Sequence, residues 1–355
     1  MADERPDLLL ARPTPFLVVD PEVLRGNVAS MAADAARRGV ALRPHAKTHK
    51  SADVAALQLA AGAVGLTVAT VSEAEAFADA GCEDLFVAYP LWVDAAKGVR
   101  LRALAERVTI SVGTDSTEGA RALAAQLPGG RVLVEVDSGH HRSGVAPDDA
   151  GAVAEAAQRA GLDVLGVFTF PGHSYAPGAA AEVAAQEALA LRTAVTSMTR
   201  HGAEPRVVSG GSTPTVAQAD ATVLTEMRPG VYVFNDAQQW ELGTVGPERV
   251  ALTCLATVVS HGEGTVVLDA GSKVLGADRP SWTTGWGRLL DHPGARVTLL
   301  SEHHAVVGWD GSPLPPLGQR VRVVPNHVCN AVNLADELVL TTGETWPVTA
   351  RGANT

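Results

Sequence analysis

Residues 43–50 read Arg-Pro-His-Ala-Lys-Thr-His-Lys, and this stretch decides between two folds. It overlaps the end of a short apolar run, Val40–Arg43, which has the pattern of a buried β-strand. An open, doubly wound sheet would place a glycine-rich phosphate loop after its first strand. This stretch contains no glycine, and it holds two of the chain's four lysines beside two histidines. The stretch therefore argues against the open sheet.

Seven further strand-like runs alternate with alanine-rich helical stretches up to residue 228. The runs are Gly65–Ala69, Asp84–Ala88, Val108–Val112, Val132–Val136, Val164–Phe168, Arg206–Ser209 and Thr222–Glu226, and the helical stretches include Ser51–Ala61, Ser72–Ala80, Asp148–Ala160 and Ala180–His201. Ser72 and Glu75 fit a capping box. Eight parallel strands close a TIM-type (β/α)8 barrel, which we predict over residues 21–240.

After about residue 245 the pattern changes to short strand-like runs separated by Gly and Pro turns, without a long helical pattern. The runs are Val250–Ser260, Thr265–Asp269, Arg296–Leu300, Ala305–Val307, Gln319–Val324 and Leu338–Thr341. We predict an antiparallel β domain over residues 241–355. The N-terminal segment, residues 1–20, includes the run Phe16–Val19, which is expected to join that domain.

Composition excludes several functional classes. The net charge of −11 argues against a nucleic-acid partner. No run of about 18 apolar residues predicts a membrane span, and the charged N-terminus is unlike a signal peptide. The three cysteines, Cys82, Cys254 and Cys329, lie far apart, which argues against a disulfide framework. We therefore expect a cytoplasmic protein that acts on a small molecule.

In a TIM barrel, reactive side chains gather at the carboxyl ends of the strands. His45 and Lys47 follow the first strand, so Lys47 could be a Schiff-base lysine, although a solvated surface lysine is the common alternative. The small residues Ser209, Gly210 and Gly211 precede an expected short helix, Pro214–Ala219, where backbone N–H groups could bind a phosphate. A simple tight turn is the alternative there. Together these features suggest pyridoxal phosphate (PLP).

A metal pair is predicted in the β domain. If the chain is extended after the strand Gln319–Val324, then His327 and Cys329 point to the same side. Imidazole and thiolate suit Zn²⁺ or another divalent metal, although a core cysteine beside a surface histidine is the commoner explanation of such spacing. His303 and His304 could supply a third ligand or a base, or could lie at a solvated strand end.

Several motifs, in order along the chain, resemble those of the D-threonine aldolase/D-serine dehydratase family of fold type III PLP enzymes, and the Cys329 ligand resembles the dehydratase side. The motifs are Thr14–Asp20, Arg43–Lys50, Gly139–Gly144, Gly172–Tyr175, Ser209–Thr215, Arg228–Tyr232, Asp269–Lys273, Ser301–His304 and Pro325–Cys329. The sequence departs from the family pattern at Phe170-Pro171, just before the motif Gly172–Tyr175, and at His303 within the motif Ser301–His304. These departures leave the side chain of the substrate open.

The resemblance implies specific roles. Lys47 would bind PLP covalently and act as the catalytic base, with His45, Arg142 and Tyr175 near the cofactor ring. Ser209, Gly210 and Gly211, with Tyr232, would hold the phosphate, and His327 and Cys329 would hold the metal. The roles of His303, His304 and Lys273 stay open.

The expected activity is dehydration of D-serine to pyruvate and ammonia. Retro-aldol cleavage to glycine and an aldehyde, dehydration of 3-hydroxy-D-aspartate, a racemase, and a non-catalytic PLP carrier or sensor remain alternatives. The resemblance also implies a head-to-tail homodimer.

Overall fold

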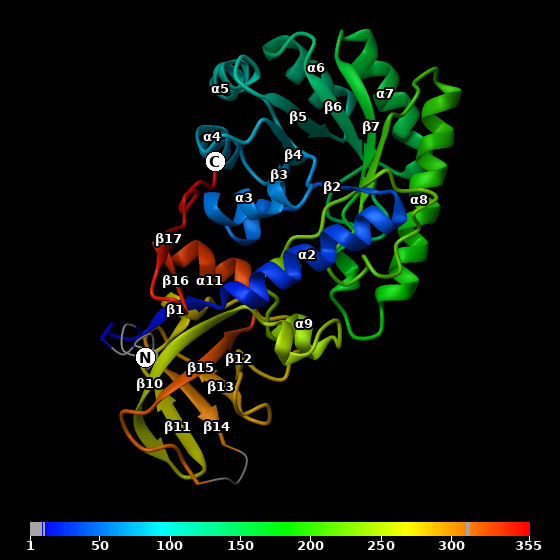
Figure 1. Cartoon of the computed structure of the whole chain (residues 1–355). Coiled ribbons are helices and arrows are strands. Elements are labelled where there is room, and N and C mark those ends of the chain that lie inside the picture. Colours follow the sequence, from blue (N-terminus) through cyan, green and yellow to red (C-terminus); the bar gives the residue numbers. More distant parts are fainter. Residues whose placement is uncertain (1–8, 10, 310–312) are drawn as a thin grey trace. The chain divides into compact units, whose positions relative to one another are not determined.

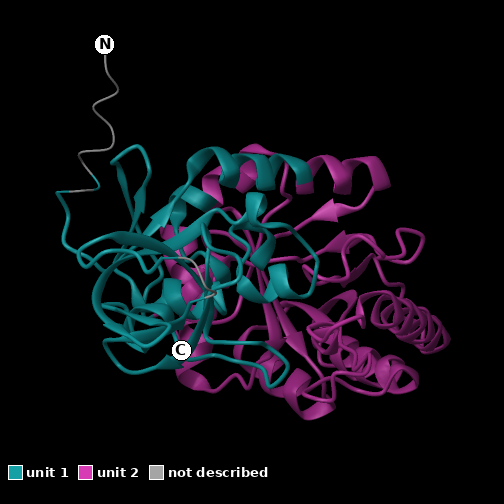
Figure 2. Ribbon diagram, turned by 90° about the horizontal axis from the view of Figure 1, so that it is seen from below, with its two compact units in different colours: residues 1–30, 48–54, 231–352 teal, residues 31–47, 55–230, 353–355 magenta. Residues whose placement is uncertain are grey.

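The protein is described here by a computed structural model that covers residue 9, residues 11–309 and residues 313–355. The chain divides into two compact units (Figure 2). Unit 1 comprises residues 1–30, 48–54 and 231–352, and unit 2 comprises residues 31–47, 55–230 and 353–355. Within the described ranges, no helix is both long enough and apolar enough to span a membrane.

Unit 2 contains an eight-stranded parallel sheet in the order β2-β9-β8-β7-β6-β5-β4-β3 (Figure 1). Its strands are β2 (Ala41–Leu42), β3 (Leu66–Val68), β4 (Asp84–Pro90), β5 (Thr109–Thr114), β6 (Arg131–Glu135), β7 (Asp163–Phe168), β8 (Val207–Gly210) and β9 (Glu226–Met227). A bridge between His45 and Thr67 joins the two edge strands. The predicted TIM-type fold of eight β/α repeats is confirmed.

Alanine-rich helices connect the strands, and α4 to α8 pack along them (Figure 1). The helices are α2 (Pro21–Arg38), α3 (Ala52–Ala60), α4 (Val71–Asp79), α5 (Ala95–Ala105), α6 (Thr117–Gln126), α7 (Ala150–Arg159) and α8 (Ala180–Arg200). The capping box predicted at Ser72 and Glu75 is wrong by two residues. Thr70 caps α4 by accepting the Glu73 N–H, and Ser72 and Glu75 instead accept hydrogen bonds from Arg100. Both placements satisfy the same spacing, so the local pattern could not separate them.

The interior of unit 2 contains a small aromatic core. Phe86 on β4 and Phe168 on β7 pack edge to face, with ring centroids 5.0 Å apart, and Leu133 and Leu165 pack around them. All four side chains are buried. Because two strands far apart in sequence supply the two rings, this packing links opposite parts of the sheet.

Unit 1 is built on a nine-stranded sheet in the order β11-β14-β13-β12-β15-β10-β1-β16-β17, with an additional pairing between β11 and β10. That pairing closes β10 to β15 into an antiparallel barrel, which β1, β16 and β17 extend. The strands are β1 (Phe16–Val19), β10 (Leu252–Gly262), β11 (Thr265–Leu268), β12 (Gly287–Leu289), β13 (Arg296–Leu300), β14 (Ala305–Gly308), β15 (Arg320–Pro325), β16 (Glu337–Leu340) and β17 (Thr345–Pro347). The predicted antiparallel C-terminal β fold is confirmed.

Three short helices, α9 (Ala237–Glu241), α10 (Ser272–Leu275) and α11 (Val328–Leu334), accompany the barrel of unit 1. The sequence pattern gave no sign of them, because each is too short to show a helical period. Strands β12 and β17 have three residues each, which is too short to show the alternation typical of a strand.

We expect Phe168→Ala to lower the free energy of unfolding by about 3–5 kcal/mol, because it leaves a cavity in the aromatic core. Chemical denaturation followed by circular dichroism measures the change. Leu189→Ala, at an exposed position on α8, is the control and should change stability by less than ~0.5 kcal/mol. Equal effects of the two substitutions would contradict the proposed importance of this core.

Candidate active site

Lys47 lies in a short 3-10 turn, Ala46–Thr48, directly after β2. The backbone before it is held on two sides. The His45 N–H donates to the Pro229 carbonyl at 3.1 Å, and the Thr67 N–H donates to the Pro44 carbonyl at 2.8 Å. The backbone that carries Lys47 is therefore fixed at the carboxyl end of the sheet, as expected for a reactive residue of this fold.

A cavity of about 460 Å³ opens at these strand ends in unit 2. This volume falls within the range of about 300–1,000 Å³ that is typical of small-molecule sites. Its lining contains His45, Lys47, Arg142, Phe170, Gly211 and Arg228. The structure therefore brings together four of the residues that the sequence singled out. Thr70, Tyr89 and Asp115 also line the cavity and lie outside every motif, whereas Ser143 lines it from within the motif Gly139–Gly144.

Phe170 lies at the centre of the predicted ring-binding residues. The Lys47 Nζ atom lies 5.5 Å from the centroid of the Phe170 ring, and the Arg142 Cζ atom lies 5.2 Å from it. The rings of Tyr175 and Phe170 are 6.4 Å apart between centroids. Cations are attracted to an aromatic face at such distances. Both basic side chains therefore lie near the ring of Phe170, a contact that the sequence analysis did not predict.

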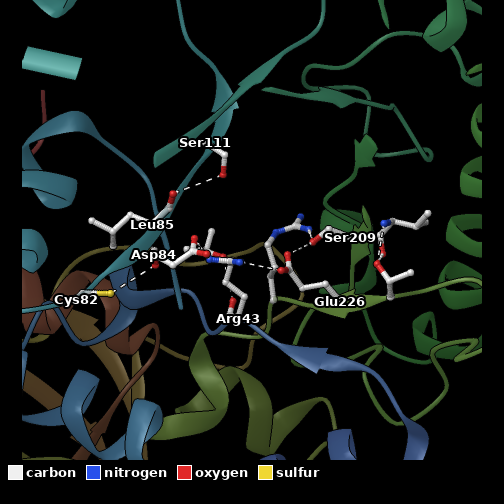
Figure 3. Close-up of polar contacts among 11 residues, drawn as sticks. Arg43, Cys82, Asp84, Leu85, Ser111, Ser209 and Glu226 are labelled. Atoms are coloured by element: carbon white, nitrogen blue, oxygen red, sulfur yellow. Dashed lines mark hydrogen bonds and ion pairs between the residues drawn. The ribbon is translucent and has the colours of Figure 1, made fainter. Parts of the chain in front are cut away.

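Arg228 lines the same cavity, and its guanidinium is held by a buried polar network. It donates to the Ser209 hydroxyl, and to the Thr169 carbonyl at 2.5 Å. Ser209 in turn donates to Glu226 at 2.6 Å, and Glu226 also accepts a hydrogen bond from Arg43 at 2.7 Å (Figure 3). Ser209 was predicted to bind phosphate, but in this structure its hydroxyl holds Arg228 and Glu226 together.

The predicted phosphate turn contacts a carboxyl group of α8. The Gly211 N–H donates to Glu187 Oε1 at 2.6 Å. A Cβ atom at position 210 would overlap with the same oxygen, so the close approach of Glu187 favours glycine there. Gly211 has φ of +81°, a conformation that favours glycine. The helix predicted at Pro214–Ala219 is wrong, because the chain forms turns there, and the helix-terminus argument for phosphate binding does not hold.

Burial raises the pKa of Glu187 to about 7, although the Gly211 N–H and Arg228 oppose the shift. Burial likewise raises the pKa of Glu135, at the end of β6, to about 7, with Ser143 and Arg142 opposing.

Tyr232, the remaining predicted phosphate ligand, is buried in unit 1 within the 3-10 turn Val231–Val233.

His327 and Cys329 lie together in unit 1, but not in the predicted geometry. The segment is not extended: His327 precedes α11 as its N-cap residue, and Cys329 is the second residue of the helix. His327 Nδ1 hydrogen-bonds to Asp278 Oδ2, and Cys329 Sγ lies 3.3 Å from the hydroxyl of Thr48, the residue after Lys47. Burial alone would lower the pKa of His327, but the Cys329 and Asp278 side chains outweigh it and raise this pKa well above its ordinary value.

These donors fit a divalent metal only in part. A nitrogen and a sulfur ligand suit Zn²⁺, and a catalytic site leaves a position for water or substrate. Within the described residues, no group of three His, Cys, Asp or Glu side chains is placed to hold a metal. The exposed side chain of Glu302 instead pairs with Lys273 at 2.9 Å, and His303 Nε2 lies 3.4 Å from the Lys273 amine. Water or substrate would therefore have to complete the coordination of an ion on His327 and Cys329.

Comparison with known proteins identifies the family of the chain. The family profile "Alanine racemase, N-terminal domain" matches residues 19–238, and the profile "Putative serine dehydratase domain" matches residues 251–341. The chain belongs to the D-threonine aldolase/D-serine dehydratase family. PLP is the cofactor expected for this family of fold type III enzymes, and the chain is accordingly a PLP-dependent lyase.

Two relatives of this family cover nearly the whole chain. D-threo-3-hydroxyaspartate dehydratase of Delftia sp. (strain HT23) is 36% identical, over 91% of this chain and 92% of that protein. D-threonine aldolase of Arthrobacter sp. is 36% identical, over 96% and 93%. The solved structure of the Delftia dehydratase matches with a TM-score of 0.88 and 34% identity, over 96% of this chain and 98% of that one.

Two variants of that dehydratase have also been solved. In one a histidine is replaced by alanine, and in the other the cysteine two positions further on is replaced; the second is described as metal-free. The spacing of the two altered residues is the same as that of His327 and Cys329.

We expect Glu187→Gln to change how stability depends on pH. The folded protein holds a proton on Glu187 more tightly than the unfolded chain does, so its stability falls as pH rises from about 4.5 to about 7. The variant lacks this loss, which is on the order of 3 kcal/mol. Chemical denaturation at several pH values measures the difference. Glu182→Gln, exposed on the same helix, should behave as wild type, and parallel curves for Glu187→Gln and wild type would contradict a neutral buried Glu187.

Proposed function

We propose that this protein is a PLP- and metal-dependent dehydratase of β-hydroxy D-amino acids, with D-serine as substrate and pyruvate and ammonia as products. The observation that carries the proposal is the position of the Lys47 amine, on a cavity that it shares with Arg142, Phe170 and Arg228. Family membership supplies the cofactor class. The His327 and Cys329 pair supports dehydration.

The residues of the cavity fit PLP. A lysine amine, the imidazole of His45, the guanidinium groups of Arg142 and Arg228, and the apolar ring of Phe170 line one space. An anionic phosphate and an aromatic ring require this combination of charge and apolar surface. When bound, PLP supplies the electron sink that acidifies the Cα–H bond of an amino acid.

Lys47 acts as the base in this proposal. Its neutral amine accepts the Cα proton of the substrate, a task that arginine cannot perform because a guanidinium stays protonated. The face of Phe170 and the backbone contacts on either side of β2 hold the lysine in place. Arg142 lies over the same ring, so its charge favours an anionic ligand in the cavity. Loss of hydroxide from Cβ, followed by hydrolysis, yields the 2-oxo acid and ammonia.

His327 and Cys329 would hold a divalent ion, for which we propose Zn²⁺. Such an ion supplies Lewis-acid activation of the β-hydroxyl as a leaving group. Two findings support this role: the matching spacing of the altered histidine and cysteine in the Delftia dehydratase, and the contact of Cys329 with Thr48, the neighbour of Lys47 in sequence.

Dehydration of 3-hydroxy-D-aspartate is the second candidate. Arg142 and Arg228 in the cavity lining offer charge for a second carboxylate, and the Delftia relative is named for that reaction. Retro-aldol cleavage is separated from both dehydrations by its products, which are glycine and an aldehyde. For the whole protein we further propose a head-to-tail homodimer in the cytoplasm, as the family resemblance implies.

We expect Lys47→Ala to abolish the visible absorbance of lysine-bound PLP and to lower dehydratase activity by roughly 10²–10⁴-fold. Absorbance spectra and a 2-oxo acid assay measure both effects. Lys97→Ala, on helix α5, is the matched control and should retain both. Persistence of the visible band in Lys47→Ala would refute the assignment of the lysine.

We expect Cys329→Ala to retain bound PLP but to lose at least ~100-fold of its activity on D-serine, because the leaving group is no longer activated. The assay uses D-serine, D-threonine and 3-hydroxy-D-aspartate, with and without chelator, and detects 2-oxo acids, glycine and aldehydes. Cys254→Ala, a buried cysteine of unit 1, is the control. Full activity of wild type after complete metal removal would overturn the metal role, and glycine plus aldehyde as the main products would overturn dehydration.

A further inference from the structure

The imidazole of His327 has two side-chain partners, Asp278 and Cys329. Nδ1 hydrogen-bonds to Asp278 Oδ2, although the two residues are 49 positions apart in sequence. A carboxylate accepts hydrogen bonds and cannot donate them, so Nδ1 carries the hydrogen in this contact. The lone pair of the neutral ring then lies on Nε2.

The segment that carries Asp278 is fastened to the segment that carries His327. The Asn326 side-chain amide donates to the backbone carbonyl of Asp278 at 2.9 Å, and Asn326 is buried. Gly276 has φ of +74°, and a Cβ atom there would lie 2.8 Å from the Cβ atom of Asn330 on α11. Glycine at 276 therefore lets the loop after α10 approach α11 closely. The contact between Asp278 and His327 belongs to this packed arrangement and is not a chance meeting of surface side chains.

A second carboxylate near the pair has a different task. Asp236 accepts the Val328 N–H at 3.1 Å through Oδ2 and the Gln239 N–H at 2.9 Å through Oδ1. It is buried, and it fixes the backbone between His327 and Cys329. Both carboxylate oxygens of Asp236 accept hydrogen bonds from backbone N–H groups. Asp278, by contrast, is the carboxylate that hydrogen-bonds to the imidazole ring.

We propose that Asp278 is a positioning residue that holds His327 in the Nδ1–H tautomer, so that Nε2 is the nitrogen that binds the divalent metal. A carboxylate that accepts a hydrogen bond from the second nitrogen of a metal-binding histidine fixes the ring orientation and makes the ligand more basic. This inference rests on the metal role in the proposed function. It adds a residue that neither the motifs nor the two-ligand pattern contains.

The test measures metal binding and the tautomer directly, in the full-length, PLP-loaded protein. Zn²⁺ affinity is measured by competition with a chromophoric chelator for wild type, Asp278→Asn, Asp278→Ala and His327→Ala. The ring nitrogens are observed by ¹⁵N NMR of histidine-labelled, Zn²⁺-loaded protein, with His327→Ala to assign the signals. Asp291→Asn is the matched control, since Asp291 is another half-exposed carboxylate of unit 1, paired with Arg322.

We expect Zn²⁺ affinity to fall ~10-fold in Asp278→Asn, which keeps an acceptor oxygen, and up to ~100-fold in Asp278→Ala. Asp291→Asn should bind as wild type does. The NMR spectrum of the wild type should show His327 with a protonated Nδ1 and a metal-bound Nε2. Bound PLP, read from its absorbance, should be unchanged in every Asp278 variant.

Two results overturn the inference while leaving the proposed function intact. One is wild-type Zn²⁺ affinity in Asp278→Ala while His327→Ala loses the metal, and the other is a metal-bound Nδ1. If His327→Ala binds Zn²⁺ as wild type does, the metal site of the proposed function fails, and the role of Asp278 fails with it.

Discussion

The buried charge of Arg228 is the constraint on which the candidate site of unit 2 depends. Burial lowers the pKa of this guanidinium, but an arginine in a protein stays protonated, so the surrounding groups must stabilise the charge. Ser209 and the Thr169 carbonyl accept its hydrogen bonds, and Glu226 supplies a nearby negative charge. These groups come from β8, from β9 and from the residue after β7. The network that satisfies Arg228 therefore also holds one of the side chains that line the cavity.

The balance of buried charge around Arg228 explains the raised pKa values of two buried carboxyl groups. Arg228 and Arg43 are matched by Glu226 and by Asp84, which accepts a hydrogen bond from Arg43 at 2.7 Å. Burial raises the pKa of two further carboxyl groups, Glu135 and Glu187, to about 7, although Arg142 and Arg228 oppose the shift at Glu135 and Arg228 opposes it at Glu187. The neutral form avoids the cost of a buried, unbalanced charge.

The candidate site combines groups that local sequence could reveal with groups that it could not. Lys47 could be predicted, because it follows a strand of regular pattern and lies in a family motif. The central role of Phe170 could not, since it depends on Lys47 and Arg142 approaching the same ring from distant segments. The pairing of His327 with Asp278 is hidden for the same reason: a contact across 49 residues leaves no periodic signal.

The sequence by itself determined the eight β/α repeats, the antiparallel β domain and the position of Lys47 directly after the first strand of the parallel sheet. Each of these follows from short-range hydrophobic patterns or from residue chemistry at a strand end. Only the tertiary structure decided how the loops after the strands are used. The chain forms turns instead of a helix after Gly211, and the Ser209 hydroxyl hydrogen-bonds to Arg228 and Glu226. A helix begins between His327 and Cys329. In each of these loops the conformation is set by partners far away in the chain, and these partners form no pattern along the sequence.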